Sequence, residues 1–241
     1  MARTFLIGGG RDPEGIVASH APFVEAAGAG DGRILVLLFD EPGHDPSRWS
    51  EALQSAGAGE VDVRVVSAAV PPAAGDLAGA AGVFVAGGWT PGYQEAFAAA
   101  PGWAEALARA GVPYAGYSAG AALAARDALV GGYVAVRGDQ RVAVCDEEAG
   151  EDLEEIAIRP GLGLLAAVVD VHCAQWGTLP RLLNAVAIHG LPGGWGIDEH
   201  TTLELGDGQA RVHGHGAVYR VGPGLDVRIL VAGDVVACDA R

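Results

Sequence analysis

Cysteine is scarce in this chain of 241 residues, and its cysteines follow no regular spacing. Cys145, Cys173 and Cys238 form no CxxC pair, whereas disulfide scaffolds and structural zinc sites use more cysteines at closer spacing. We therefore expect three reduced thiols, and we predict no bound metal and no cofactor.

Long apolar runs are also missing, although 50% of the residues are hydrophobic. The longest blocks, such as Leu164 to Val171, are far shorter than the roughly 20 residues that a membrane-spanning helix needs. The first apolar segment is interrupted at Gly8-Gly9-Gly10, and no secretory signal pattern is visible. We therefore expect no membrane partner and a cytoplasmic location.

Basic residues are outnumbered: 15 lysines and arginines stand against 30 acidic side chains, and the formal net charge is −15. A surface of this sign repels the phosphates of nucleic acids and of anionic lipid headgroups alike. Nucleic acid is therefore not an expected partner, and a solvated surface is the simplest account of the acidity.

Short apolar segments alternate with alanine-rich segments of helical spacing along the first half of the chain. The predicted strands are Thr4–Ile7, Arg33–Phe39, Val61–Val66, Gly82–Val85 and Val112–Tyr117. The predicted helices are Gly15–Ala27, Asp45–Ser55, Pro91–Ala100 and Trp103–Ala110. This alternation predicts an α/β fold, a mainly parallel sheet with helices on both faces.

The second half continues this pattern and then changes. We expect a helix over Ala119–Arg126, a strand over Leu164–Asp170, a helix over Leu179–His189 and a strand over Gly194–Asp198. From Thr201 to Cys238, alternating segments between glycine-rich turns predict antiparallel hairpins at the sheet edge. The acidic segment Asp139–Pro160 is expected to be an exposed excursion. With neither a repeat nor a long linker, residues 1–241 are predicted to form a single domain.

The most informative local sequence is Gly116-Tyr-Ser-Ala-Gly120, which lies between a predicted strand and an alanine-rich helix. This context is typical of a nucleophile elbow, a tight turn that holds Ser118 in a strained backbone geometry at the start of a helix. The alternative is a glycine-rich turn in which Ser118 merely caps the helix.

A serine hydroxyl needs a base to take its proton and an acid to orient that base. His172 and Glu199 each follow a predicted strand at its carboxyl end, where open α/β sheets gather their sites. Convergence on Ser118 is expected if those strands are parallel neighbours of the strand before it. Strand alternation favours Glu199 over Asp198 as the orienting acid. The other candidate bases, His189 and His200, are less well placed, and the pair His213 and His215 lacks further metal ligands.

Four patches together resemble the peptidase E and cyanophycinase family of serine peptidases, which has a class I glutamine amidotransferase-like fold. They are Gly8-Gly9-Gly10, Phe84-Val85-Ala86-Gly87-Gly88, the Ser118 elbow, and Val169-Asp170-Val171-His172 followed by Gly196-Ile197-Asp198-Glu199. The resemblance implies Ser118 as nucleophile, His172 as general base and Glu199 as its orienting acid. It also implies an oxyanion hole formed by the N–H groups of Gly88 and Ala119.

Departures from the family pattern bear on the substrate. Cyanophycinases carry arginines after the histidine and a glutamine after the Gly-Gly pair, whereas this chain has few basic residues there. The candidate substrate-binding residues are Trp89, Thr90, Gln175, Trp176 and Arg181. Arg181 or Arg11 would have to bind an acidic substrate side chain, and the two tryptophans suit apolar walls.

These features predict a serine peptidase that hydrolyses an amide bond in short peptides, with neutral or apolar residues preferred next to the scissile bond. A glutamine amidotransferase is disfavoured because it carries cysteine at the elbow. The remaining alternative is a non-catalytic binding or regulatory module that keeps the same fold. The oligomeric state stays open, a homodimer included.

Overall fold

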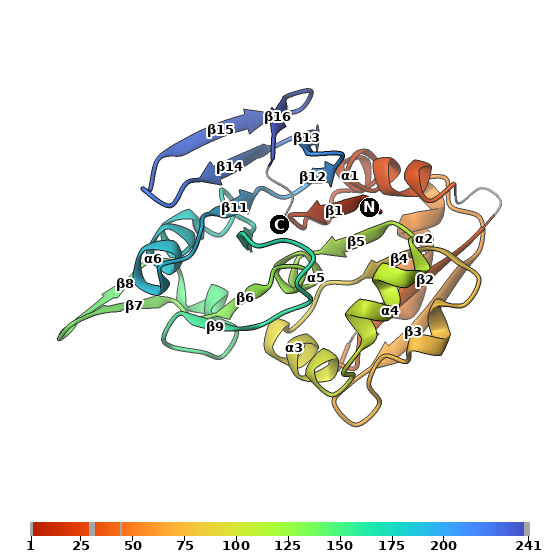
Figure 1. Ribbon diagram of the computed structural model, residues 1–241, viewed down its shortest axis with the longest axis horizontal. Coiled ribbons are helices and arrows are strands. Elements are labelled where there is room, and N and C mark those ends of the chain that lie inside the picture. Colours follow the sequence, from red (N-terminus) through yellow and green to blue (C-terminus); the bar gives the residue numbers. More distant parts are fainter. Residues whose placement is uncertain (1, 29–31, 44, 239–241) are drawn as a thin grey trace.

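The computed structural model describes residues 2–28, 32–43 and 45–238 (Figure 1). These residues build a large sheet of eight strands in the order β16-β13-β12-β1-β5-β4-β2-β3. Its strands are β1 (Thr4–Ile7), β2 (Arg33–Phe39), β3 (Val61–Val66), β4 (Ala80–Val85), β5 (Tyr114–Tyr117), β12 (Thr201–Gly206), β13 (Gln209–Gly214) and β16 (Val235–Ala237). Strands β1 to β5 pair in parallel, and the three C-terminal strands pair antiparallel at one edge.

Helices separate most of the parallel strands. They are α1 (Pro13–Ala26), α2 (Pro46–Ser55), α3 (Thr90–Ala98), α4 (Trp103–Ala110), α5 (Ala119–Leu123) and α6 (Leu179–His189), with short 3₁₀ turns η1 (Ala74–Leu77) and η2 (Glu147–Gly150). The strand order reverses direction after β3. Because parallel crossovers are right-handed, this reversal moves the later helices to the opposite face. Accordingly α1 packs with α2, and α3 packs with α5 (Figure 1).

Strand β2 shows why the predicted strands in the first half of the chain are continuous apolar runs. Ile34 to Leu37 are fully buried, since helices cover both faces of the central sheet. The predicted α/β class, the mainly parallel sheet and the antiparallel C-terminal strands are confirmed. Predicted element ends differ by up to four residues: the strand predicted over Leu164–Asp170 begins at Val168. The helix predicted over Ala119–Arg126 ends at Leu123, and Arg126 beyond it donates its N–H to the carbonyl of Leu165.

A second sheet of four strands among the described residues changes one expectation. Its order is β10-β11-β14-β15, formed by β10 (Val168–Val171), β11 (Gly194–Ile197), β14 (Ala217–Val221) and β15 (Val227–Val231). The strands that precede His172 and Glu199 are parallel to each other, as expected, but they are not neighbours of β5. The reason is that β12 occupies the free edge of β1 and ends the parallel part of the large sheet there.

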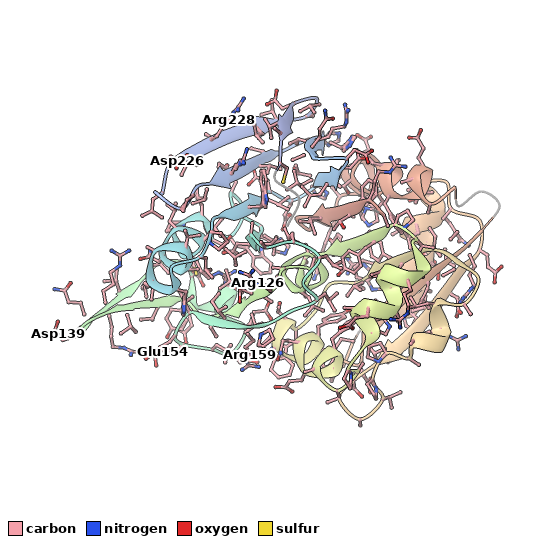
Figure 2. All side chains as sticks on the ribbon, viewed as in Figure 1. Arg126, Asp139, Glu154, Arg159, Asp226 and Arg228 are labelled. Atoms are coloured by element: carbon pink, nitrogen blue, oxygen red, sulfur yellow. The ribbon has the colours of Figure 1, made fainter. Side chains whose placement is uncertain are left out.

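The segment Asp139–Pro160 is only partly the exposed excursion that its composition predicts. Strands β7 (Val134–Arg137) and β8 (Gln140–Ala143) form a hairpin whose tip, at Asp139, projects from the body of the protein (Figure 2). The rest returns to the protein: β9 (Ala157–Pro160) pairs with β6 (Asp127–Gly131), and Ala149 is buried. The segment therefore carries many acidic side chains, although part of its backbone pairs with β6 and packs against the rest of the protein.

None of the helices in the described residues is long and apolar enough to cross a membrane.

His20, on α1, is a buried titratable group within the core. Its ring stacks on Phe84 with centroids 5.4 Å apart, and Nδ1 lies 3.0 Å from the Ser19 hydroxyl. Nε2 has no hydrogen-bond partner among the described residues. Burial lowers the pKa of His20 from 6.5 to about 4, so the folded protein keeps this ring neutral at pH values where the unfolded chain protonates it.

This difference predicts acid-dependent stability. Since the folded-state pKa lies below the unfolded value, the stabilisation is lost as the pH falls from 6.5 toward 4. Between pH 7 and pH 4.5 the group should remove about 2–3 kcal/mol from the free energy of unfolding. Urea denaturation at both pH values should show this loss in the wild type and a smaller loss in His20→Gln. Equal pH dependence of the two proteins would contradict the assignment.

Candidate active site

Ser118 lies on a sharp turn between β5 and α5. Its backbone has φ 51° and ψ −110°, a conformation that costs about 1–3 kcal/mol in a residue with a side chain. The glycines of the motif permit this packing. A Cβ on Gly116 would lie 2.3 Å from the carbonyl oxygen of Gly120, and one on Gly120 would lie 2.3 Å from that of Val85. The predicted elbow is therefore present.

The three side chains predicted from the sequence form a continuous hydrogen-bonded chain. Ser118 Oγ lies 2.8 Å from His172 Nε2, and Nδ1 of the same ring lies 2.8 Å from Glu199 Oε1. Asp198 faces elsewhere, with its two carboxylate oxygens accepting the N–H groups of Ala174 and Ala217. The arrangement can move a proton from the serine to the imidazole and stabilise the charge that results.

Three consecutive carbonyls at the end of β1 hold the segments that meet here. Each accepts one backbone N–H from a different part of the chain, over 2.8 to 3.2 Å. The donors are Ser118 to Ile7, His172 to Gly8 and His200 to Gly9. The glycine patch after the first strand, noted in the sequence, thus brings the two sheets together at the site.

The remaining histidines take other places. His189 ends α6, and His200 packs against Gly10 and Gly15. His213 Nε2 lies 2.8 Å from the Glu204 carboxylate. Across the described residues, no cluster of three or more His, Cys, Asp or Glu side chains is arranged to hold a metal ion.

His172 is held in its neutral form by its surroundings. Burial lowers the pKa of His172 below its ordinary value of 6.5, although the hydrogen bond and the charge of Glu199 oppose the shift. A neutral imidazole at neutral pH has the protonation state that a general base requires.

A cavity of about 650 Å³ opens beside these side chains. Ser118, His172 and Glu199 line it together with Gly88, Trp89 and Trp176. Charged side chains for which the sequence predicts no role in a site also line it: Glu41, Asp45, Arg48, Glu148 and Glu151. Glu148 and Glu151 belong to the acidic segment Asp139–Pro160, which was expected to be an exposed excursion but contributes to the cavity wall.

The predicted oxyanion donors lie close to the serine. Gly88 lines the cavity, and the loop at Gly87 is so close that a Cβ there would lie 3.2 Å from Ser118 Cβ. Ala119 is the first residue of α5, directly after the elbow. The role of these two N–H groups stays a prediction.

Two predicted substrate-binding residues bind protein groups and do not line the cavity. Thr90 donates its N–H and its hydroxyl to the Glu151 carboxylate, at 3.3 and 3.0 Å. Gln175 accepts the N–H of Glu199 at 3.0 Å, so it supports the acid of the hydrogen-bonded chain. Trp89 and Trp176 line the cavity as expected for apolar walls.

Arg181 also requires a correction. It is only 6% exposed, and its guanidinium binds both carboxylate oxygens of Asp170, at 2.7 and 2.9 Å. It also donates to the carbonyl of Ala149. A guanidinium used in this way does not line the cavity, so Arg181 is not positioned to bind an acidic substrate side chain. Its contacts instead join β10 and α6 to the segment that carries Glu151.

Comparison with known proteins yields matches among solved structures only. No family model matches the chain, and no curated protein matches it either. A crystal structure of a peptidase from an acI-B1 Actinobacterium matches with a TM-score of 0.67 and 17% identity, over 98% of this chain and 97% of that one. A protein from Listeria monocytogenes EGD-e, provisionally described as a peptidase E, matches with a TM-score of 0.58 and 14% identity over 90% of this chain and 100% of its own. The chain has a peptidase E-like fold.

The peptidase E-like fold confirms the resemblance inferred from the sequence at the level of architecture. At these identities the likeness concerns the fold, and the chemistry has to be argued from the side chains of this chain.

Glu199 and Asp198 should respond differently to loss of charge. Glu199→Gln removes the carboxylate that orients His172, so covalent labelling of Ser118 by a fluorophosphonate probe should slow by about 10³-fold or more. Asp198→Asn instead turns one acceptor into a donor facing a backbone N–H, which should cost about 1–3 kcal/mol of stability. Active-site labelling rates and urea denaturation of both variants distinguish the two roles. The reverse ranking would mean that Asp198 acts on the histidine.

The pH dependence of fluorophosphonate labelling at Ser118 tests the protonation state of His172. The reaction requires a neutral ring, so its rate should fall as the pH drops through a midpoint below 6.5. Glu199 opposes the downward shift, and Glu199→Gln should therefore move the midpoint to still lower pH while reducing the plateau rate. Labelling rates measured from pH 4 to pH 8 provide the comparison. A midpoint above 6.5 in the wild type would contradict the burial argument.

Proposed function

We propose that this chain is a serine peptidase that hydrolyses an amide bond in short peptides. The observation that carries the proposal is the hydrogen-bonded chain Ser118, His172 and Glu199 at a strained elbow that opens into a cavity. The peptidase E-like fold supports it, because two solved structures with this architecture are described as peptidases.

In the proposed reaction the Ser118 hydroxyl attacks the carbonyl carbon of the peptide bond, and His172 Nε2 takes its proton. The tetrahedral intermediate collapses when His172 gives that proton to the leaving amine, which leaves an acyl group on Ser118. Water then enters, loses a proton to His172 and attacks the ester carbonyl carbon. The second tetrahedral intermediate breaks its bond to Ser118 Oγ, His172 returns the proton to that oxygen, and the acid product departs.

Charge develops on the carbonyl oxygen during both steps. The N–H groups of Gly88 and Ala119 are the proposed donors to this oxyanion, and a donor of this kind contributes about 3 kcal/mol of transition-state stabilisation. Burial lowers the pKa of His172 and so favours the neutral ring that can accept the serine proton, while the hydrogen bond to Glu199 orients that ring.

The charges that line the cavity support a preference for neutral or apolar residues beside the scissile bond. Arg11 and Arg48 are the arginines that line it among the described residues. The carboxylates that line it are those of Glu41, Asp45, Glu148, Glu151 and Glu199. An acidic substrate side chain would enter a mainly acidic site, and Arg181 is committed to Asp170.

A non-catalytic binding module with the same fold is the competing function. It would need no strained serine within 2.8 Å of a base, and the elbow geometry therefore favours the enzyme. The two functions differ in whether Ser118 reacts covalently.

Ser118→Ala should abolish hydrolysis and leave the fold intact, since only a hydroxyl is lost. Removal of a triad member typically costs about 10⁴-fold or more in rate. A fluorophosphonate probe should label the wild type, with the adduct on Ser118 by mass spectrometry, and leave Ser118→Ala unlabelled. Cys173→Ser is a matched control near the site and should be labelled. An unlabelled, folded wild-type protein would favour the binding module.

Substrate preference is tested on matched dipeptides that carry Asp, Ala or Leu before the scissile bond. We expect kcat/KM for the Asp peptide to be no higher than for the other two. A preference for Asp of more than about tenfold, or 1.4 kcal/mol in transition-state binding, would contradict the acidic-cavity argument. Arg11→Ala and Arg48→Ala would then show which guanidinium supplies the cation.

A further inference from the structure

The indole ring of Trp176 lies flat against the imidazole of His172. The ring centroids are 4.0 Å apart and the planes differ by only 8°. Trp176 is nevertheless 46% exposed and lines the cavity. Nearly half of this side chain therefore lies in solvent, while one face of its indole is covered by the imidazole.

Two hydrogen bonds hold the backbone that carries Trp176 beside the imidazole. The backbone N–H of Trp176 donates to the carbonyl of His172 at 2.8 Å, which closes a single turn between the two residues. Two residues further on, the buried Thr178 hydroxyl donates to the carbonyl of Val171 at 2.7 Å. Both ends of the turn are thus tied to the end of β10, directly beside the imidazole.

The imidazole is constrained on its other sides as well. Its two nitrogens are bound to Ser118 and Glu199, and the backbone of Gly9 lies so close that a Cβ there would be 2.1 Å from Cε1. The indole is the contact that covers a face of the ring. Rotation of the imidazole out of the plane shared by Ser118 and Glu199 would therefore have to displace Trp176.

A π face also attracts a cation, and histidine becomes one whenever it holds the serine proton. We propose that Trp176 is a positioning residue whose indole fixes the plane of the His172 imidazole and stabilises the imidazolium formed when Ser118 loses its proton. This inference rests on the proposed serine peptidase function. It goes beyond the role of an apolar substrate wall, because the indole would act through the base whatever the substrate is.

Other groups also influence the charge of this ring. They are Ser118 at the elbow, Asp170 on β10, Arg181 on α6 and Glu199 after β11, with Arg11 lining the same cavity. Since none of them is changed by a substitution at residue 176, the aromatic contribution can be isolated with two variants. Trp176→Leu keeps apolar cover over the ring without a π face, and Trp176→Phe keeps both.

The experiment uses the full chain and two readouts. The first is the rate of fluorophosphonate labelling of Ser118 against pH, and the second is the NMR titration of the His172 ring nitrogens. Trp176→Leu should label about tenfold more slowly at the pH plateau, which lies between the effects expected for an exposed and for a fully desolvated cation–π contact. The pKa of His172 should be lower in this variant. Trp176→Phe should stay within about threefold of the wild type in rate and retain its pKa.

Two results would overturn the proposal. Wild-type behaviour of Trp176→Leu would mean that apolar cover is sufficient, and an equal loss in Trp176→Phe would mean that the π face is not the cause. Circular dichroism checks the fold, and Trp176→Met replaces the leucine variant if the latter does not fold. If the wild type does not label at all, the proposed function fails, whereas the NMR comparison still tests the contact between the two rings.

Discussion

Three backbone hydrogen bonds at the end of β1 determine where the candidate site forms. The carbonyls of residues 7 to 9 accept N–H groups from the elbow, from the turn after β10 and from the residue after Glu199. Two sheets that are not hydrogen-bonded to each other as strands are joined here. Side chains at this junction must be absent for such close approach, which explains the run of glycines after the first strand. These backbone hydrogen bonds therefore set the positions from which Ser118, His172 and Glu199 reach one another.

A second interaction, the ion pair of Asp170 and Arg181, holds segments that line the cavity. The buried pair of Asp170 and Arg181 joins β10 to α6, and the guanidinium also holds the carbonyl of Ala149. That segment brings Glu151 to Thr90, at the start of α3. A buried ion pair contributes little net stability, because desolvation offsets the attraction, but loss of one partner leaves an unpaired charge. The pair therefore acts mainly by fixing where the segment that carries Glu148 and Glu151 lies along the cavity wall.

Strong local patterns account for what could be predicted. Strand β2 is a continuous apolar run, α6 has a helical spacing, and the elbow motif requires glycine on both sides of Ser118. Each is a property of a few adjacent residues. Glu199 could be preferred to Asp198 because neighbouring positions on an extended segment point in opposite directions. Arg181 could not be placed, since the sequence shows a cation near the histidine but not the buried carboxylate that binds it.

The sequence by itself determined the α/β class, the elbow and the identities of the three side chains that meet there. Tertiary structure decided the placement of β10 and β11 in a second sheet, the burial of Arg181, the acidic wall of the cavity and the indole stacked on His172. The physical reason is the distance along the chain over which each kind of interaction acts. Periodicity and turn chemistry act between near neighbours along the chain. Which strand edge is taken by β12, and which side chain lies over the imidazole, depends instead on packing between segments that are far apart in sequence.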